Sequence, residues 1–534
     1  MNGAVERAVG APRLGPRLAA VLGVETRPAT LVLIAGIPAL IAAWAVWSTE
    51  TMLSRYGVMD LLFNLAGGWH IANGQAAHDG FHEAVGQLNF LLTAIAFQVV
   101  GPSVRAFLVG EIIMLALLFA TACVAAAPRL PLVAAVVFVL FNALPAVMPT
   151  NIGDPLDVYS FAMSYNRYGW GAIGTLCLIL FVPPRQGPAV RRLDIATGAA
   201  LLVAMFYIKL TYFMVGVAGL VLALAVSDHV RAARAGWIAV LIALLANAIA
   251  PYSHGYLADF LLAATSGFGK TEPANLLRVI FNNGIECALY GAGVILALQL
   301  WRNGRAPARL PAAALFAFAG GLALLSQNTQ HHGAQLGLSI AFLLYDALSR
   351  SARPVLPPAL QAALLLAPLM SIGGIAIGLA GYHVSAGRPA NHHVVDRTQL
   401  RGLAVPGNPG GSYPSNRDTR YVAMLIEAAD LFAAAGEPPG RIELLDRINP
   451  LPFVLGAPPP RGRDLWWEPS MPPRPAETLL GDADHVLLPK PFTTPEVERL
   501  VATQYADYLA RHFPYRRETA HWTVLSRRPP VRPS

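Results

Sequence analysis

The sequence predicts a mainly α-helical protein, a polytopic membrane bundle of about eleven spans followed by an extracytoplasmic α/β domain. Of its 534 residues, 55% are hydrophobic and 13% are charged. The charged fraction is about half that of an ordinary soluble protein. Apolar runs recur as far as Tyr382, after which Pro, Gly and charged residues become dense. We therefore expect the first part of the chain to lie in a membrane and the last part to lie outside it.

The net charge of +8 is explained by the orientation of the chain in the membrane. Many Lys and Arg residues stand in short segments between apolar runs, as they do in loops that stay in the cytoplasm. We therefore expect no nucleic-acid partner.

The three cysteines, Cys123, Cys177 and Cys287, lie inside apolar runs, where a thiol behaves as a small core side chain. We expect neither a disulfide nor a cysteine metal site.

Residues 1–29 form a basic segment before the first apolar run. A signal peptide would fit this pattern, but the further spans favour a membrane anchor with a cytoplasmic N-terminus. The predicted spans are Thr30–Ser48, Arg105–Ala127, Leu130–Met148, Tyr168–Pro183, Gly236–Ala250, Ile285–Leu300, Leu310–Ser326, Gln335–Leu348 and Leu360–Tyr382.

Two regions leave the number of spans open. Leu88–Val100 is short for a span, and a consistent orientation allows only two of the three candidates between Leu88 and Met148 to cross. The sequence does not choose among the three. Ile195–Val226 is too long for one helix, and we expect two short helices that turn near Lys209.

Basic loops define the orientation, since Lys and Arg accumulate on the cytoplasmic side. We place four such loops there: Arg185–Arg192, Arg231–Arg234, Arg302–Arg309 and Arg350–Arg353. The alternate segments then face outward: Asn151–Arg167, Pro251–Gly284, Thr329–Gly333 and the tail after Tyr382. The predicted domains are a membrane domain over residues 30–386, with a long external loop at 49–87, and a periplasmic domain over residues 387–534.

The tail reads as a small α/β domain. Strand-like runs at Arg441–Asp446, His485–Leu488 and His521–Leu525 alternate with helical patterns at Tyr421–Ala435 and Pro495–Phe513. Such alternation is typical of a layered α/β structure.

The first outward loop, Thr49 to Gln87, contains the most informative pattern. Its apolar residues between Leu61 and Ile71 have the period of an amphipathic helix, as in a helix that lies in the membrane interface. Asp60 stands where the chain leaves the first span, and Asp79 follows several glycines later. We expect this loop to line a site at the membrane surface.

This loop resembles that of the C-type (GT-C) integral-membrane glycosyltransferases. Their first external loop carries an early acidic residue and then a pattern like D-x3-h-x3-G-x2-I-x2-G-x4-D. The chain has Asp60, Gly68, Ile71, Gly74 and Asp79 at closely matching spacing. It departs at Asn64, where the pattern has an apolar residue. The resemblance covers the first loop well, the spans loosely and the tail by architecture only.

The resemblance implies transfer of a sugar from a polyprenyl-phosphate carrier on the outer face of a bacterial inner membrane. A carboxylate would take the proton of the acceptor hydroxyl, with Asp60 as the first candidate and Asp79 as the second acid. In the alternative interpretation, Asp60 caps an interfacial helix and Asp79 is a solvated turn residue.

Further polar residues of the same loop are candidates for contact with acceptor or sugar. They are His78, His82 and Glu83. A divalent cation, Mg²⁺ or Mn²⁺, could bind this cluster, but its spacing matches no defined metal site. Polar residues at an interface are the alternative.

Candidates for the donor phosphate come from the next two segments. Arg167 and Asn166 begin a span, and a guanidinium matches a phosphate well. Lys209, flanked by apolar residues, suggests function because a lysine inside a membrane segment is costly. Tyr165 is a candidate sugar contact. An aromatic belt with a snorkelling Arg or Lys is the alternative for all four.

The remaining outward segments offer His254, Gln330 and His331 as sugar ligands, or as plain polar caps. The stretch GFGKTEP is not a P-loop, because Ala264 stands where the first Gly is needed and no strand precedes it.

The leading interpretation is thus a GT-C-like glycosyltransferase. Its donor would be a polyprenyl-phosphate sugar, and its acceptor a cell-envelope glycan, lipid or protein. One alternative is a transporter or flippase for envelope lipids or polymers, which predicts polar residues deep in the membrane and broken helices. The other alternative is a non-catalytic envelope assembly protein.

Overall fold

The computed structural model describes most of the chain. The described residues are 21–185, 188–266, 273–327, 333, 335–350, 357–388, 392–407, 416–434 and 439–529. Within them, helices dominate, and strands are confined to two small sheets. The predicted mainly α class is therefore confirmed.

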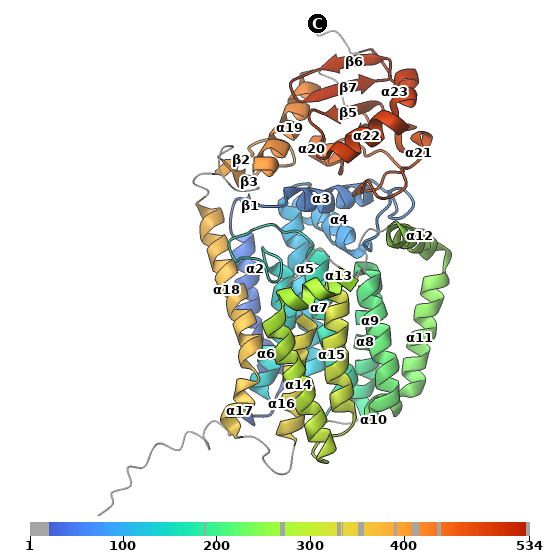
Figure 1. Cartoon of the computed structure of the whole chain (residues 1–534). Helices are drawn as coiled ribbons and strands as arrows, with labels where there is room; N and C mark the ends of the chain where they lie inside the picture. The colour runs from blue at the N-terminus through green and yellow to red at the C-terminus, as the bar shows by residue number, and fades with distance from the viewer. Residues whose placement is uncertain are drawn as a thin grey trace, which may run out of the picture.

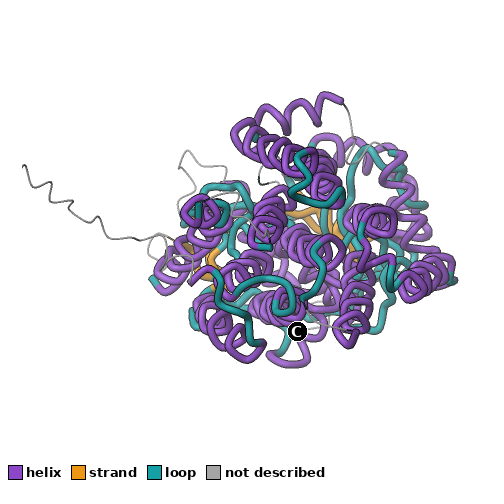
Figure 2. Tube along the Cα trace, turned by 90° about the horizontal axis from the view of Figure 1, so that it is seen from below, coloured by secondary structure: helices purple, strands orange, loops and turns teal. Residues whose placement is uncertain are grey.

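Long helices run side by side along one axis (Figure 1) and are seen end-on from below (Figure 2). They are α2 (Pro28–Trp47), α5 (Arg105–Ala126), α6 (Leu132–Ala143) with the 3₁₀ turn η1 (Leu144–Val147), α7 (Ser164–Phe181), α8 (Pro188–Ile208), α9 (Leu210–Val226), α11 (Arg234–Ile249), α14 (Gly284–Arg302), α15 (Arg309–Ser326), α16 (Gln335–Ser349) and α18 (Leu366–Gly387). Short helices α10 (Asp228–Arg231) and α17 (Pro358–Ala363) lie at one end of this bundle.

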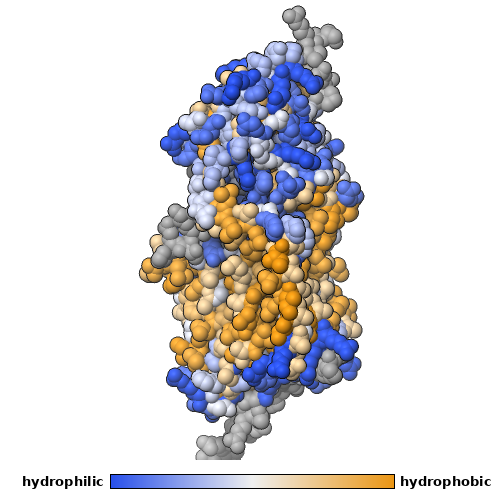
Figure 3. Space-filling model, turned by 90° about the vertical axis from the view of Figure 1, so that its right-hand side faces the viewer, coloured by the Kyte–Doolittle hydropathy of each residue, from blue (hydrophilic) through white to orange (hydrophobic). Residues whose placement is uncertain are grey.

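The surface of the bundle fits a membrane. A broad hydrophobic zone covers its middle, with hydrophilic zones above and below (Figure 3). Among the described residues, five helices are long and apolar enough to cross a membrane, or six if the bent pair α11–α12 is one span. Shorter apolar helices include α6, α9 and α16. The chain is a multi-pass membrane protein.

The structure resolves both uncertain regions. Leu88–Val100 forms α4, which packs against α3 (Val58–Ala72) at the end of the bundle that carries the C-terminal domain (Figure 1). The Phe63 and Phe90 rings meet edge to face, with centroids 5.3 Å apart. α4 is therefore the candidate that does not cross. Ile195–Val226 contains parts of α8 and all of α9, and the chain turns between them at Lys209, as predicted.

The third outward segment is mostly helical. After Ala250 the chain bends by 77° from α11 into α12 (Pro251–Thr265), and Pro251 suits the first position of a helix because its missing N–H is not needed there. The short helix α13 (Pro273–Asn282) follows. α12 lies beside α3 and α4, near the C-terminal domain (Figure 1).

The C-terminal domain has a four-stranded sheet in the order β4-β5-β7-β6. Its strands are β4 (Ile442–Leu444), β5 (His485–Pro489), β7 (Trp522–Ser526) and β6 (Tyr515–Glu518). Its helices are α19 (Asn416–Ala433), α20 (Leu451–Leu455), α21 (Ala476–Leu480), α22 (Pro495–Gln504) and α23 (Ala506–His512). The predicted strands and helices of the tail are confirmed, and β6 is a strand that the sequence did not predict.

A second sheet joins the two parts of the molecule. β1 (Met52–Leu53) leaves the first span and pairs in parallel with β3 (Leu403–Pro406), which pairs in turn with β2 (His392–Val394). Met52 lies opposite Leu403 in this register. The first outward loop is thus fixed to the C-terminal segment directly after the membrane.

The contact of α3 with α4 depends on small residues in α3. A Cβ placed on Gly67 would lie 2.3 Å from Cδ1 of the buried Phe90. We expect Gly67→Ala to destabilise the protein by about 1–3 kcal/mol, because overpacking forces neighbouring side chains to move. The thermal unfolding midpoint of the purified protein in detergent measures this effect.

Gly373→Ala is the matched control. Gly373 is also helical, and no heavy atom lies within 4 Å of its added Cβ. We expect it to be neutral or slightly stabilising, since Ala is the better helix former. Equal midpoints for the two variants would contradict the packing of α3 against α4.

Candidate active site

The candidate site lies where the first outward loop meets the N-terminal turn of α7, the α8–α9 turn and the C-terminal domain. α3 lies between the bundle and this domain (Figure 1). The Trp69 Nε1–H donates to the Ala457 carbonyl at 2.8 Å, and the Gln75 amide donates to the Pro459 carbonyl at 2.8 Å. The C-terminal domain therefore contacts the loop at the end of α3 and just after it.

Asp60 occupies the first turn of α3. Gly57, at φ 69°, turns the chain into this helix, a conformation that glycine adopts without strain. The Val58 N–H donates to Oδ2 of Asp418, on α19, at 3.2 Å. Burial, and then the charge of Asp418, raise the pKa of Asp60 to about 7. Near neutral pH this carboxyl group can accept and release a proton.

Polar groups of α7 and the α8–α9 turn face the same region. The Lys209 ammonium lies 3.5 Å from the Asn166 side-chain oxygen and 5.2 Å from the centre of the Tyr165 ring. The Tyr212 hydroxyl donates to the Asn166 carbonyl at 3.2 Å. Lys209, Asn166 and Tyr165, three of the candidates from the sequence, thus lie close to one another.

Tyr165 connects this group to the acids of the first loop. Its hydroxyl lies within electrostatic range of both Asp60 and Glu83. Glu83 is buried, and its carboxylate accepts from the Ala84 N–H at 2.8 Å and the Trp466 N–H at 3.2 Å. Burial is the main cause that raises the pKa of Glu83 to about 8. Asp60, Glu83, Tyr165, Asn166 and Lys209 form what we name the outer site.

A network of charged groups holds the loop beside the outer site. Nδ1 of His78 and Nδ1 of His82 each lie 3.0 Å from a carboxylate oxygen of Asp259, on α12. Arg474, in the C-terminal domain, lies 3.4 Å from Asp259. It also lies 2.7 Å from Asp464 of the same domain. We name these five residues the loop clamp. It joins the first loop, α12 and the C-terminal domain.

The clamp defines what His78 and His82 do in this structure. Both imidazoles contact Asp259, and the Arg474 cation shares that carboxylate. Among the residues that the structure describes, no group of three or more His, Cys, Asp or Glu side chains is arranged to hold a metal ion. Contact of His78, His82 and Glu83 with acceptor or sugar stays a prediction.

The structure places Arg167 in a buried ion pair, and its contact with the donor phosphate stays a prediction. Its guanidinium is almost fully buried and lies 2.5 Å from the equally buried Glu111, on α5. It also donates to the carbonyls of Ala162 and Thr150 at 3.2 and 3.4 Å. A guanidinium engaged in this way joins α5 to the start of α7 and does not face the outer site.

Four other predicted residues are either exposed or lie outside the described residues. Asp79 is exposed, and its side chain makes no hydrogen bond or ion pair with any described residue, as its alternative interpretation as a solvated turn residue requires. His254 is exposed on α12, where Nε2 lies 3.0 Å from the Ile249 carbonyl. Gln330 and His331 lie outside the described residues.

Comparisons with known proteins give a likeness in structure only. No protein-family model and no curated protein matches the chain. A crystal structure of ArnT from Cupriavidus metallidurans in the apo state is 11% identical, with a TM-score of 0.44, over 93% of this chain and 97% of that chain. The same protein bound to undecaprenyl phosphate is 14% identical, with a TM-score of 0.46, over 93% and 98% of the two chains.

Both comparisons extend over most of the two chains that they align. At such identities the likeness assigns no residue a role. The roles proposed below therefore rest on the contacts of this chain alone.

Several residues of the site had no signal in the sequence. Asp418, Asp259 and Arg474 are 358, 199 and 414 positions away from Asp60 by their residue numbers. Nothing in their neighbouring residues marks them as partners of the first loop. Glu111, inside an apolar run, did carry a signal, because an ionisable residue within a span is by default functional or paired.

The ion pair of Arg167 and Glu111 can be tested by a double-mutant cycle. Arg167→Met leaves a buried carboxylate without its cation, and we expect a loss of about 3–5 kcal/mol in stability. The double variant Arg167→Met with Glu111→Leu removes both charges, and we expect it to recover most of that loss. Thermal unfolding in detergent measures both. If Arg167→Met instead folds normally and only weakens donor binding, the ion pair is not a structural link and the phosphate prediction is supported.

Proposed function

We propose that the chain is a GT-C-type glycosyltransferase. It transfers a sugar from a polyprenyl-phosphate carrier to a cell-envelope glycan, lipid or protein at the membrane face that carries the C-terminal domain. The observation that carries this proposal is Asp60, a half-buried carboxyl group at the start of α3 with a pKa of about 7. A general base works best when its pKa lies near the working pH.

The proposed step is an inverting displacement. The acceptor hydroxyl oxygen attacks the anomeric carbon of the sugar, and Asp60 takes the hydroxyl proton. The bond from the anomeric carbon to the carrier phosphate breaks, and the phosphate leaves with the electron pair. Cationic and hydrogen-bonding groups stabilise the developing negative charge. Lys209, with Asn166 and Tyr165 beside it, supplies such groups in the outer site.

The lipid tail of the carrier needs an apolar path from the membrane. A cavity of about 440 Å³ lies between α14, α16 and α18, with Leu289, Met370 and Ile375 in its wall. Its wall also includes Ile152 to Asp154. The segment before α7 that contains Ile152 to Asp154 continues to Ser160 and Ala162. The Cβ atoms of these two residues lie 3.9 Å from a Cβ built on Gly57, just before α3. We place the carrier tail in this cavity.

The buried charges within the bundle favour catalysis at the surface over transport. In the described part of the bundle, Arg167 pairs with Glu111, and Arg129 pairs with Asp194 at 2.7 Å. Both pairs are internal to the protein. In a transporter, charged groups within the bundle would line a path and contact the solute that passes.

Asp60→Asn tests the proposed base. We expect transfer from a radiolabelled polyprenyl-phosphate sugar to fall about 10²–10⁴-fold, the usual contribution of a general base. Asp507→Asn is the control, because Asp507 is exposed on α23, in the C-terminal domain. Full activity of Asp60→Asn would contradict the proposed step. The same assay with and without EDTA tests whether Mg²⁺ or Mn²⁺ takes part.

The pH dependence tests the environment of Asp60. Its ionised form is the active one, so the rate should rise as pH increases through about 7. The negative charge of Asp418 contributes to this raised pKa. Asp418→Asn should therefore move the acidic limb of the pH–rate profile to lower pH. A limb that stays in place would show that Asp418 does not act on the titrating group.

We also propose that the C-terminal domain faces the periplasm of a bacterial cell. The short helix α10, which ends with Arg231, lies at the opposite end of the bundle (Figure 1). The positive-inside rule assigns an end with basic loops to the cytoplasm. In a variant without native cysteines, we expect a membrane-impermeant thiol reagent to label Asp79→Cys in intact cells. Labelling of Arg302→Cys instead would reverse the orientation.

A further inference from the structure

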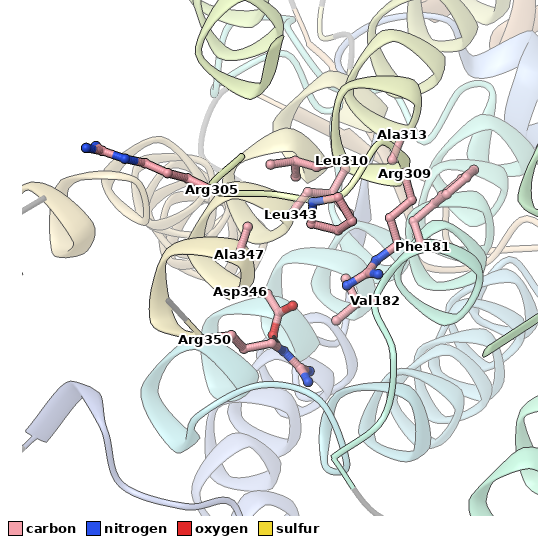
Figure 4. Close-up of a pocket in the computed structure, with 11 residues that line it drawn as sticks. Phe181, Val182, Arg305, Arg309, Leu310, Ala313, Leu343, Asp346, Ala347 and Arg350 are labelled. Atoms are coloured by element: carbon pink, nitrogen blue, oxygen red, sulfur yellow. Dashed lines mark hydrogen bonds and ion pairs between the residues drawn. The ribbon is translucent and has the colours of Figure 1, made fainter. Parts of the chain in front are cut away.

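A second polar cavity lies at the end of the bundle remote from the C-terminal domain. Its volume is about 180 Å³, and it is lined by α15, α16 and the end of α7 (Figure 4). The outer site lies near the other end of α7, at Tyr165 and Asn166, whereas this cavity includes Phe181 at the end of that helix. The proposed transfer reaction therefore makes no use of this cavity.

Three arginines and one aspartate line the cavity. Asp346 is buried and lies 2.7 Å from Nε of Arg350, which also donates to the Pro183 carbonyl at 2.6 Å. A further arginine, Arg185, lies 4.0 Å from the same carboxylate. The negative charge of Asp346 is thus already shared by two cations.

Arg309 is the cavity arginine that is available to bind a ligand. Figure 4 shows Arg309 and Arg350 on different sides of Asp346, whereas Arg305 extends away from them. Arg309 is partly buried, and its guanidinium makes no hydrogen bond or ion pair with any described residue. The charge of Asp346 also acts on Arg309, but Arg350 and Arg185 lie closer to that carboxylate. A partly buried cation is stabilised by a direct anionic partner. The cavity therefore has an excess of positive charge and a set of donors available to an anion.

The rest of the wall is apolar. Phe181, Leu310 and Leu343 line the cavity beside the arginines. Trp301, at the end of α14, is exposed at the same end of the bundle, and exposed tryptophans are typical of the membrane interface. The cavity thus combines an apolar wall with several arginines, as a site for a lipid headgroup would require.

We propose that this cavity binds the phosphate of an anionic phospholipid in the leaflet remote from the C-terminal domain. Guanidinium groups match phosphate oxygens with paired hydrogen bonds. Basic cavities between transmembrane helices on the cytoplasmic side bind anionic headgroups. The apolar wall accommodates the first methylene groups of the lipid.

The size of the cavity fits a headgroup. At about 180 Å³, it is smaller than the roughly 300–1,000 Å³ of cavities that take drug-sized ligands. A phosphate with its glycerol fits, and the acyl chains would lie along the exposed apolar side of α15, where Leu315 is 56% exposed. Free phosphate shares the same chemistry, so the experiment separates the two sources.

The test uses the full-length protein in a nonionic detergent, titrated with short-chain phosphatidylglycerol, short-chain phosphatidylcholine or inorganic phosphate. The readouts are the thermal midpoint and the number of lipids retained in native mass spectrometry. We expect phosphatidylglycerol to stabilise the protein at lower concentration than phosphatidylcholine. Arg309→Gln should weaken that binding at least about tenfold, equivalent to about 1.4 kcal/mol.

Arg302→Gln is the matched control. Arg302 is exposed at the C-terminal end of α14 and does not line the cavity. It should bind phosphatidylglycerol as the unmodified protein does. Ala347→Phe fills the cavity without changing its charge, and it should weaken binding as Arg309→Gln does. Equal affinity in Arg309→Gln and Arg302→Gln would overturn the proposal. Inorganic phosphate that replaces phosphatidylglycerol at equal concentration would overturn the assignment to a lipid.

Discussion

The carboxylate of Asp259 is the point at which three distant parts of the chain meet. Burial opposes its ionisation, but hydrogen bonds from His78 and His82 outweigh burial and hold its pKa at about 2. Asp259 therefore remains charged over the whole physiological pH range. It binds both imidazoles of the first loop and the Arg474 guanidinium of the C-terminal domain. The loop, α12 and the C-terminal domain thus form one body.

This connection places the outer site. With the clamp at one end of the loop and the β1–β3 pair at the other, α3 is fixed against the C-terminal domain. Asp418 can then reach the start of α3 and act on Asp60. The raised pKa of Asp60 is therefore a property of the assembled molecule. An isolated first loop in water would leave the pKa of Asp60 close to its ordinary value, because neither burial nor Asp418 would act on it.

The sequence predicted those features that depend on local patterns. Apolar runs gave the bundle, and the strand and helix periods of the tail gave its α/β domain. The turn at Lys209 followed from length alone, since one helix could not hold Ile195–Val226. The sequence left open whether Leu88–Val100 crosses the membrane, because that depends on its packing against α3 through Phe90. The position of Asp60 was predicted, but its partner Asp418 was not.

The ion pair of Arg167 could not be predicted from the sequence, and the reason is physical. An arginine at the start of a span fits a phosphate ligand, a snorkelling cation and a buried ion pair equally well by residue type. The deciding residue is Glu111, on a neighbouring helix, and only the packing of α5 against α7 shows that they meet. Asp79 illustrates the same limit, because motif spacing does not determine whether a side chain faces a site or solvent.

The central claim is that the clamp makes the first loop, α12 and the C-terminal domain one unit. Hydrogen exchange of the full-length protein in detergent, compared with Arg474→Gln, tests it most directly. We predict faster exchange in residues 76–86, in α12 and in residues 459–474 together, with exchange in α5 unchanged, because local opening follows cooperative units. Faster exchange confined to the residues around position 474 would contradict the claim.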